Sequence, residues 1–380
     1  MNIIDKTILA PYYLVLKFRH FLFDKNIKKT YKSSIKTISV GNVTVGGTGK
    51  TPHTEMILRL LGETMPKEKL AVLSRGYKRK SRGFQQVSLE GSAKMFGDEP
   101  FQIKNKFPKT TVVVDSSRKR ALQYLENPKT LLESKKVKKC RFPELNPVDV
   151  VVLDDAFQHR AVTPNVSIVL MDYSKPIYED HLLPIGRLRD LPSRVKVADI
   201  LIFTKCSVYM EDLEKCELAK SVGVKNYDCT TGLGQNESGA NQWVFFTSIN
   251  YINSVGIFDN ADTRYIYSKR LILFTGIAND APLVSYLCDN YDIVEHFNFP
   301  DHHSYSKSNM NMIFSSSKLY PTAVIMTTEK DAQKIKDYKE KLPLEYQKKM
   351  FQVPIEVDFL EPERDKINFI NAINSLFLSR

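Results

Sequence analysis

The chain contains a glycine-rich segment whose residue types and spacing suit phosphate binding. Residues 44–51 read TVGGTGKT and follow the apolar run Ile35–Val40. Glycines let backbone N–H groups curve around a polyphosphate, a lysine reaches the outer phosphates, and a hydroxyl ligates Mg²⁺. A helix that begins at the lysine adds its positive end to the same site. The segment predicts a nucleotide site built from Thr44, Val45, Gly46, Gly47, Thr48, Gly49, Lys50 and Thr51.

One position departs from the usual pattern, because Thr44 stands where such loops commonly begin with glycine. A Gly-Lys-Thr tripeptide alone is common by chance. The two further glycines, the strand before them and the helix after them favour a nucleotide site over the alternative, a glycine-rich hairpin turn.

A second segment supplies the acid that a phosphate-loop site requires. Residues 148–155 read VDVVVLDD, an apolar strand that ends in two aspartates. An aspartate at the end of a strand beside the phosphate loop holds Mg²⁺ directly or through water. We predict that Asp154 is the metal partner and that Asp155 polarises a water or a hydroxyl. The alternative is a pair of surface acids after a strand.

Four further loops are polar where strands are expected to end. Their sequences are SRGY at 74–77, GDEP at 97–100, LPIGRLRD at 183–190 and FPDHHSY at 299–305. Taken singly, the first three are more typical of solvated turns, although arginines suit phosphate recognition. In the last, a histidine next to an acid suits a general base; a zinc site lacks a suitably spaced third ligand.

Composition limits the classes of protein. With 42% hydrophobic and 26% charged residues the chain is globular, and five cysteines without a CxxC pair indicate a reducing compartment. The net charge of +12 suits nucleic acid, an anionic membrane or a phosphorylated substrate. Without a nucleic-acid-binding motif we predict no nucleic-acid partner. The lysine-rich run 135–141 is interpreted as a solvated loop.

The N-terminus is apolar and aromatic but too short to cross a bilayer. Its uncharged run, residues 7–16, is followed by charged residues and by a lysine cluster, and no signal-peptide cleavage pattern is present. Such a helix either lies in a membrane interface or packs on its own domain. The residues alone leave both interpretations open. The lysines are Lys25, Lys28, Lys29, Lys32 and Lys36.

The elements that must position these residues alternate between short β-branched runs and room for helices, a pattern that predicts a mostly parallel sheet. A Gly/Asn/Ser-rich break at 230–242 marks a domain boundary, after which residues 243–251 suit edge strands. A smaller α/β pattern follows, with a strand at 353–359 and a terminal helix at 367–378. The expected strands are residues 35–40, 70–73, 111–114, 148–153, 166–171, 200–203, 271–274, 293–297 and 323–326.

Taken together, these motifs resemble the tetraacyldisaccharide 4′-kinases, the lipid A 4′-kinases of Gram-negative bacteria. The matching segments occur in the family's order and run through most of the chain. A phosphate loop is shared by many unrelated enzymes, whereas the whole set is specific. The segments are residues 40–52, 73–77, 97–100, 153–159, 183–189, 275–279, 300–302 and 328–331.

The resemblance implies transfer of the ATP γ-phosphoryl group to the 4′-hydroxyl of a tetraacylated glucosamine disaccharide 1-phosphate, yielding lipid IV-A. It implies a phosphate-loop NTPase-like α/β domain and a smaller C-terminal α/β domain, joined by a β-stranded linker. It also implies peripheral or monotopic binding to the anionic cytoplasmic face of the inner membrane. The expected parts are a membrane-interface helix (1–25), a kinase domain (26–235) and the C-terminal domain with its linker strands (243–380).

Residue roles follow from the matched motifs. The resemblance implies that Lys50 and Thr51 hold phosphates and Mg²⁺ with Asp154, and that Asp98 orients His302, which accepts the proton of the sugar hydroxyl. Because the two residues lie in different domains, the site would be complete only on closure. The further expected catalytic residues are Asp155, Arg118 and Arg189, and the expected substrate contacts are Asn42, Arg75, Tyr77, Gln158, His159 and Asp190.

Two positions differ from the family's usual pattern: Ala156 stands in place of glycine and Asp190 in place of glutamate, which shortens any contact made there. Two other functions stay open. A regulatory or transport nucleotidase would hydrolyse nucleotide without an acceptor. A kinase of a soluble sugar or cofactor would not need residues 1–25. The absence of an Asn-Lys-x-Asp motif disfavours GTP, although Thr204 and Lys205 end an expected strand.

Overall fold

The larger of two sheets has ten strands, in the order β15-β9-β7-β6-β1-β5-β2-β4-β3, with β8 paired to β9. In this computed structural model, which describes residues 3–133 and 145–380, all pairings from β4 to β9 are parallel. The lysine-rich run 135–141 lies outside the described residues. The strands are β1 (Lys36–Asn42), β2 (Leu70–Ser74), β3 (Gln85–Gln86), β4 (Thr111–Val114), β5 (Val150–Leu153), β6 (Val166–Asp172), β7 (Ile200–Thr204), β8 (Leu233–Gln235), β9 (Asn241–Tyr251) and β15 (Ile355–Phe359).

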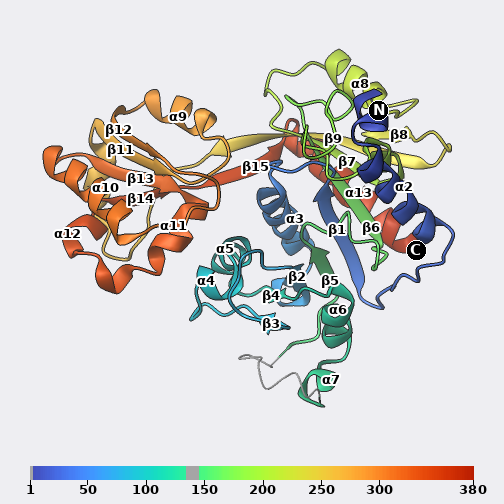
Figure 1. Cartoon of the computed structure of the whole chain (residues 1–380), viewed down its shortest axis with the longest axis horizontal. Coiled ribbons are helices and arrows are strands. Elements are labelled where there is room, and N and C mark those ends of the chain that lie inside the picture. Colours follow the sequence, from blue (N-terminus) through green and yellow to red (C-terminus); the bar gives the residue numbers. More distant parts are fainter. Residues whose placement is uncertain (1–2, 134–144) are drawn as a thin grey trace.

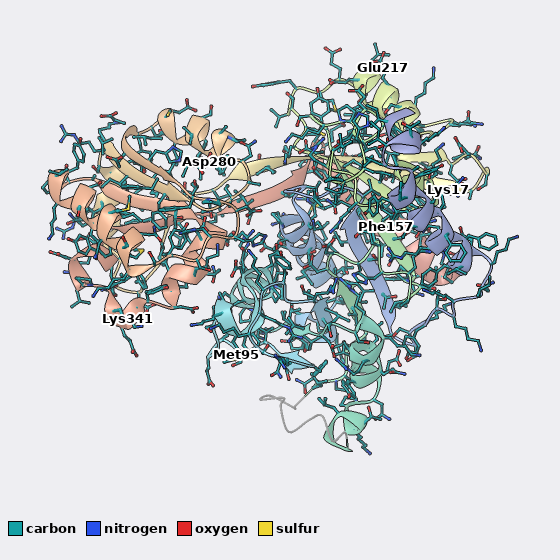
Figure 2. The ribbon with its side chains drawn as sticks, in the orientation of Figure 1. Lys17, Met95, Phe157, Glu217, Asp280 and Lys341 are labelled. Carbon is teal, nitrogen blue, oxygen red and sulfur yellow. The ribbon has the colours of Figure 1, made fainter. Side chains whose placement is uncertain are left out.

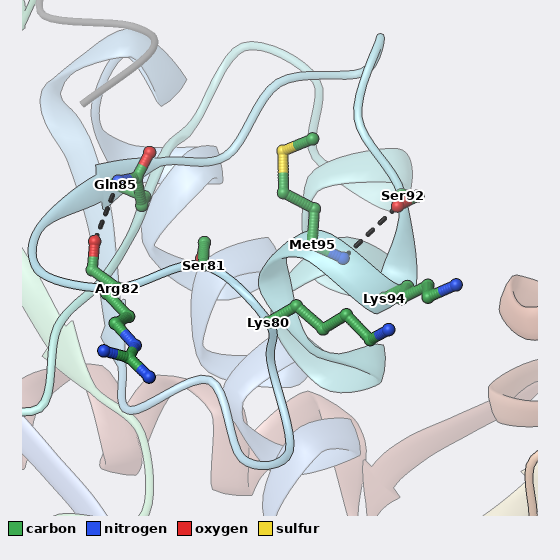
Figure 3. Close-up of a pocket in the computed structure, with 7 residues that line it drawn as sticks. All are labelled: Lys80, Ser81, Arg82, Gln85, Ser92, Lys94 and Met95. Carbon is green, nitrogen blue, oxygen red and sulfur yellow. Dashed lines mark hydrogen bonds between the residues drawn. The ribbon is translucent and has the colours of Figure 1, made fainter. Parts of the chain in front are cut away.

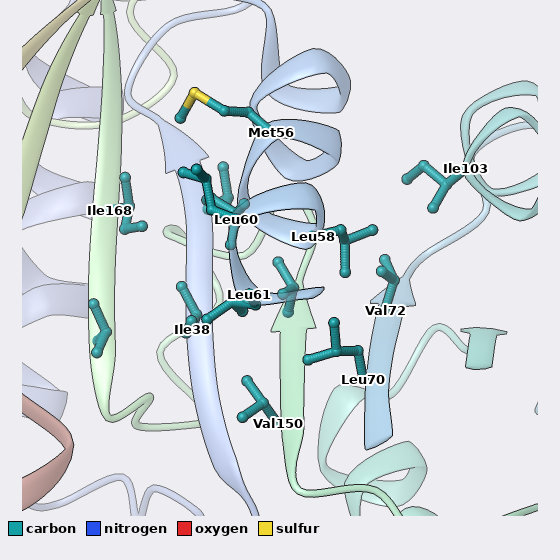
Figure 4. Packing of buried hydrophobic residues seen from close by; sticks show 14 of the residues in the cluster. Ile38, Met56, Leu58, Leu60, Leu61, Leu70, Val72, Ile103, Val150 and Ile168 are labelled. Carbon is teal, nitrogen blue, oxygen red and sulfur yellow. The ribbon is translucent and has the colours of Figure 1, made fainter. Parts of the chain in front are cut away.

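Helices cover both faces of this sheet, which explains why its central strands are apolar on both sides. Every residue of β5 is buried. On one face α3 (Lys50–Thr64) places Leu58, Leu60 and Leu61 against Ile38 and the neighbouring strands (Figure 4). The other helices of this part are α1 (Ile3–Thr7), α2 (Ala10–Asp24), α4 (Ala93–Phe96), α5 (Asp98–Lys106), α6 (Arg118–Glu126), α7 (Pro128–Glu133), α8 (Asp212–Ser221) and α13 (Pro362–Ser379).

The second sheet has five strands in the order β10-β14-β13-β11-β12, parallel except for β10, and lies beside the first domain (Figure 1). The mostly parallel α/β fold predicted for both parts is confirmed. The elements are β10 (Val255–Gly256), β11 (Arg270–Thr275), α9 (Ala281–Cys288), β12 (Asp292–Asn298), α10 (Lys307–Leu319), β13 (Val324–Thr328), α11 (Glu329–Lys336), α12 (Leu344–Gln347) and β14 (Met350–Val353).

The chain passes twice between the two sheets. β9 pairs in the large sheet, and the chain then enters the small one; after β14 it returns through β15, which pairs antiparallel with β9. The expected strand 353–359 corresponds to β15, while its first residue, Val353, ends β14 of the small sheet; Pro354, which has no N–H to donate to a ladder, separates the two. α13 packs Phe369 and Ile373 into the core of the large domain. The expected segment 243–380 thus contains the small sheet and elements of the large one.

The N-terminal helix α2 packs on its own domain and also exposes apolar side chains; its contact with a membrane stays a prediction. It packs on its own domain through Leu16 and His20, while Leu14, Val15 and Phe18 are each at least 60% exposed. No helix within residues 3–133 and 145–380 is long and apolar enough to cross a bilayer. Figure 2 places Lys17 on α2, at the periphery of the large domain.

Candidate active site

The predicted phosphate loop lies between β1 and α3, and its backbone needs glycine at two positions. Gly46 and Gly49 have φ angles of +101° and +79°, which residues with a side chain rarely adopt. Gly49 directly precedes the helix, so α3 begins at Lys50 and its free N–H groups face the loop. The sequence therefore produces the strand, loop and helix that it predicts.

Thr44, the irregular first position, has a structural explanation. It forms an antiparallel bridge with Leu188, and the N–H of Val45 donates to the Arg187 carbonyl at 2.7 Å. The first two residues of the phosphate loop are thus held by the LPIGRLRD segment, residues 183–190. A residue with extended backbone suits this pairing better than glycine, which would add backbone freedom.

Asn42, at the end of β1, connects the loop to the residues around it. Its Nδ2 donates to Thr48 Oγ1 at 2.7 Å, its Oδ1 accepts from Arg189 Nη2 at 2.5 Å, and its carbonyl accepts from Gln158 Nε2. The Lys50 ammonium lies 3.5 Å from the same Oδ1. Asn42 is fully buried and its contacts order the loop, while its contact with substrate stays a prediction.

Asp154 follows β5 and is buried. Its Oδ2 accepts from Ser74 Oγ at 3.1 Å, whereas its Oδ1 has no hydrogen-bond partner among the described residues. Burial, together with the charges of Glu99 and Asp155, raises the pKa of this carboxyl to about 7. An unpaired buried carboxylate oxygen is costly unless a ligand satisfies it. Mg²⁺ takes one or two carboxylates plus phosphate oxygens, so Asp154 and the Thr51 hydroxyl form a fitting donor set.

Asp155 and Arg189 form an ion pair beside the loop. Burial of Asp155 is outweighed by the hydrogen bond from Arg189 and by the charges of Lys50, Arg189 and Arg118, which lower the pKa of its carboxyl. Arg118 is buried and donates to the backbone carbonyls of Asp154 and Asp155 at 2.6 and 2.7 Å. Arg118 therefore holds the two acids in place, and its burial lowers the pKa of the guanidinium to about 10.

Asp98 and His302, predicted to act together, meet across the domain boundary. The distance from Asp98 Oδ2 to His302 Nδ1 is 3.9 Å, an ion-pair distance rather than a hydrogen bond. The Tyr77 ring packs edge-on against the imidazole, with 5.4 Å between centroids. Asp98 follows Gly97, whose Cβ position would lie 3.2 Å from the Gly76 Cα. Because the two glycines approach each other closely, Tyr77, which follows Gly76, and Asp98, which follows Gly97, lie close together.

Two lysines of α11 that received no predicted role complete this cluster. Lys330 Nζ lies 3.3 Å from His302 Nε2, and Lys334 Nζ lies 3.6 Å from Asp98 Oδ2. Burial of Asp98 is outweighed by its contact with His302 and by the charges of Lys334 and Lys330, so the pKa of Asp98 is lowered. Lys330 belongs to the TEKD motif and Lys334 follows it one helical turn later, a spacing that would have revealed them.

The remaining predicted substrate residues lie on two sides of the loop. Arg75 Nη1 contacts His159 Nε2 at 3.2 Å, and burial, followed by the charges of Arg118 and Arg75, lowers the pKa of His159 to about 4. Asp190 instead lies under α2, where its Oδ1 contacts His20 Nε2 at 2.6 Å. The structure thus brings Arg75 and His159 together and directs Asp190 to the N-terminal helix.

A surface pocket of about 380 Å³ borders the segment that leads into Asp98 (Figure 3). Its three cations are Lys80, Arg82 and Lys94, and the side chains of Lys80 and Lys94 extend alongside each other. The backbone of Lys80 donates to the Lys94 carbonyl at 3.0 Å, which joins the loop after Tyr77 to α4. The pocket has the charge that an anionic ligand requires.

The fold and this geometry define a two-domain α/β protein of the phosphate-loop class, in which a second domain brings a histidine to an acid of the first. The family model for tetraacyldisaccharide-1-P 4'-kinase matches residues 6–374. The chain belongs to this family, which confirms the family resemblance read from its motifs.

Curated relatives and a solved structure of the same family are similar to this chain over most of its length. A tetraacyldisaccharide 4'-kinase of Phocaeicola vulgatus is 36% identical over 92% of this chain and 88% of its own length. That of Flavobacterium johnsoniae is 35% identical over 96% of both chains. The crystal structure of LpxK from Aquifex aeolicus in complex with ATP has a TM-score of 0.66 and 26% identity, covering 97% of this chain and 99% of that one.

Proposed function

We propose that this protein transfers the γ-phosphoryl group of ATP to the 4′-hydroxyl of a tetraacylated glucosamine disaccharide 1-phosphate, forming lipid IV-A. Family membership and the relatives' names support the reaction. The observation that carries it is the meeting of Asp98 and His302, from different domains. A base assembled from two domains suits a reaction between two bound substrates, because it is complete only when the site has closed and excluded water.

His302 is the general base in this proposal. It takes the proton of the 4′-hydroxyl while the oxygen bonds to the γ-phosphorus and the bond to the β-phosphate oxygen breaks, releasing ADP. With Nδ1 facing Asp98, the accepting nitrogen is Nε2. Lys330 Nζ contacts this nitrogen at 3.3 Å, so the sugar hydroxyl has to displace it. Asp98 orients the imidazole and stabilises the imidazolium.

The phosphate end uses residues of the large domain. Backbone N–H groups of residues 44–51 and the Lys50 ammonium hold the ATP phosphates. Mg²⁺, held by Thr51 and Asp154, would neutralise charge on the phosphates when bound. Arg189, paired with Asp155, lies beside Lys50 and adds positive charge near the transferring group. Arg118 holds Asp154 and Asp155 in place through hydrogen bonds to their backbone carbonyls.

The acceptor is anionic and acylated, and the surface suits both properties. Tyr77 packs against His302, and Arg75 contacts His159. Gln158 contacts Asn42 beside the loop, and its carbonyl accepts from Arg19 of α2. Three cations line the neighbouring pocket without a carboxylate among the lining residues. Asn42 and Asp190 contribute by holding the loop and α2 in place.

Membrane association follows from α2 in this proposal. Leu14, Val15 and Phe18 form an exposed apolar stripe, and the lysines after the helix would attract anionic lipid, each by about 1 kcal/mol. The protein would bind the cytoplasmic face of the inner membrane without crossing it, and would have no nucleic-acid partner. Such placement gives the site direct access to an acylated substrate.

The decisive experiment mixes the purified protein with ATP, Mg²⁺ and the acylated disaccharide 1-phosphate in detergent micelles. We expect transfer of labelled γ-phosphate to the disaccharide, abolished in Lys50→Met. ATP hydrolysis without transfer would instead support the nucleotidase. Transfer to a soluble sugar, unaffected by removal of residues 1–25, would support the soluble-sugar kinase.

A further inference from the structure

One lysine is shared by buried carboxylates of both domains. Lys106 Nζ lies 2.8 Å from Glu55 Oε2 and 2.9 Å from Glu329 Oε2. Glu55 belongs to α3 and Lys106 ends α5, both in the large domain, whereas Glu329 begins α11 of the second domain. Gln102 Nε2 also donates to Glu55 Oε1 at 2.8 Å. We name these four residues the Lys106 cluster.

The cluster joins the three helices that carry the proposed chemistry. α3 begins with the phosphate-loop residue Lys50, α5 begins with Asp98, and α11 carries the lysines that contact the Asp98–His302 pair. α11 packs on α5, as Figure 1 shows. Lys334 faces Asp98 at one end of this helix pair, and Lys106 faces Glu329 at the other, about 12 Å away along α5.

Lys106 supplies the positive charge that the two buried carboxylates of the cluster require. The Glu55 and Glu329 side chains are 5% and 8% exposed, so two like charges face each other with little water between them. Burial raises the pKa of both carboxyls, that of Glu55 to about 7, and the Lys106 charge opposes this effect. Removing the cation from such a site leaves buried charges uncompensated, which strongly disfavours the contact.

We propose that Lys106 is a positioning residue for phosphoryl transfer: by bridging Glu55 and Glu329 it holds α11 against α5 and so keeps His302 beside Asp98. The inference rests on the proposed function for its kinetic consequence, but not for its structural one. A second contact, from Asn105 Nδ2 to Gln333 Oε1 at 2.8 Å, lies on the same surface and carries no charge.

The chain offers a matched control. Lys104 lies on the same helix, but its ammonium donates to the carbonyls of Pro108 and Thr110, within the large domain. We expect Lys106→Met to lower kcat by about tenfold or more, because the closed form becomes less populated. The KM for ATP should change by less than about threefold, since the phosphate loop lies in the large domain. Lys104→Met should do neither, and Lys106→Arg should restore most of kcat.

A readout independent of lipid phosphorylation is hydrogen exchange of the full-length chain. In Lys106→Met, exchange should increase in peptides covering α5 and α11 and stay unchanged in β13, the core strand of the second domain. Glu329→Gln keeps the Lys106–Glu55 pair and should increase exchange in α11 as well. The double variant should be little worse than Lys106→Met, because both changes break one contact.

The outcomes separate the hypotheses. Unchanged exchange in α5 and α11 of both variants would overturn the proposal, as would additive losses of kcat in the double variant. If Lys106→Met does not fold, Glu329→Gln decides alone. Increased exchange in a protein that transfers no phosphate to the lipid would support the bridge and refute the proposed function.

Discussion

Lys334 Nζ lies 3.6 Å from Asp98 Oδ2, so a cation of the second domain faces the acid that orients the proposed base. Lys334 also contacts Asp331 at 3.0 Å, which fixes its position on α11. Because Lys334 helps to lower the pKa of Asp98, Lys334→Met should raise that pKa, so that kcat/KM falls more steeply at the acidic end of its pH profile. The pH dependence of kcat/KM, measured with the lipid acceptor, tests this expectation. Lys341→Met, on the exposed rim of the second domain (Figure 2), should leave the acidic end of the profile unchanged.

The Asp98–His302 pair should behave as one unit. His302→Ala and Asp98→Ala should each lower turnover by about 10²–10⁴-fold, the usual contribution of general base catalysis. The double variant should be little worse than either single one, because Asp98 acts through the imidazole. Steady-state kinetics of the four proteins test this. Multiplicative losses would show that the residues have separate roles.

His53 should make the stability of the large domain pH-dependent. Its ring is fully buried, with Nδ1 2.7 Å from the Gly49 carbonyl and Nε2 2.9 Å from Thr247 Oγ1, and burial lowers its pKa to about 4. The unfolded chain then binds the proton more readily. The stability of the folded state that depends on a neutral His53 is fully present above pH 6.5. It is lost as the pH falls toward 4, by about 3 kcal/mol. Urea unfolding of His53→Gln should show a smaller loss over that range; an identical loss would contradict the assignment.

The exposed stripe of α2 should control binding to lipid. Leu14 and Phe18 lie one turn apart on the same face, so changing both to serine removes apolar contact worth several kcal/mol if the stripe is buried in lipid. Sedimentation with phosphatidylglycerol vesicles should show binding weakened by more than about tenfold. Leu378→Ser, at an even more exposed apolar position on α13, is the control. Equal weakening by both changes would mean that α2 has no special part.

Local features were predictable from the residues because near neighbours determine them. The alternation of apolar and polar residues indicated most strands, and glycines with positive φ, such as Gly49, marked the loop. Where prediction differed from structure, the competing influence was tertiary. The strand expected at 353–359 begins at Ile355, because Val353 ends β14 of the small sheet and Pro354 separates it from β15.

The site was predictable in part. The phosphate loop and Asp154 follow from spacing, whereas the pairing of Asp98 with His302 came from the family resemblance, since no local pattern connects residues 204 positions apart in the chain. Lys106 was missed because a lysine on a helix is usually a solvated surface residue and nothing in the local pattern marks its partners. Asp190 illustrates the opposite case: a conspicuous motif residue whose carboxylate contacts His20 of the N-terminal helix.

The sequence by itself determined the phosphate loop, the acid at the end of β5 and the alternation that requires a parallel sheet, because each depends on residues within a few turns of one another. Only the tertiary structure decided that the chain leaves the large sheet after β9 and returns as β15. That path brings α11 onto α5, and with it His302 to Asp98 and Glu329 to Lys106. Contacts between distant segments depend on how sheets and helices pack, and a burial preference along the chain does not specify them.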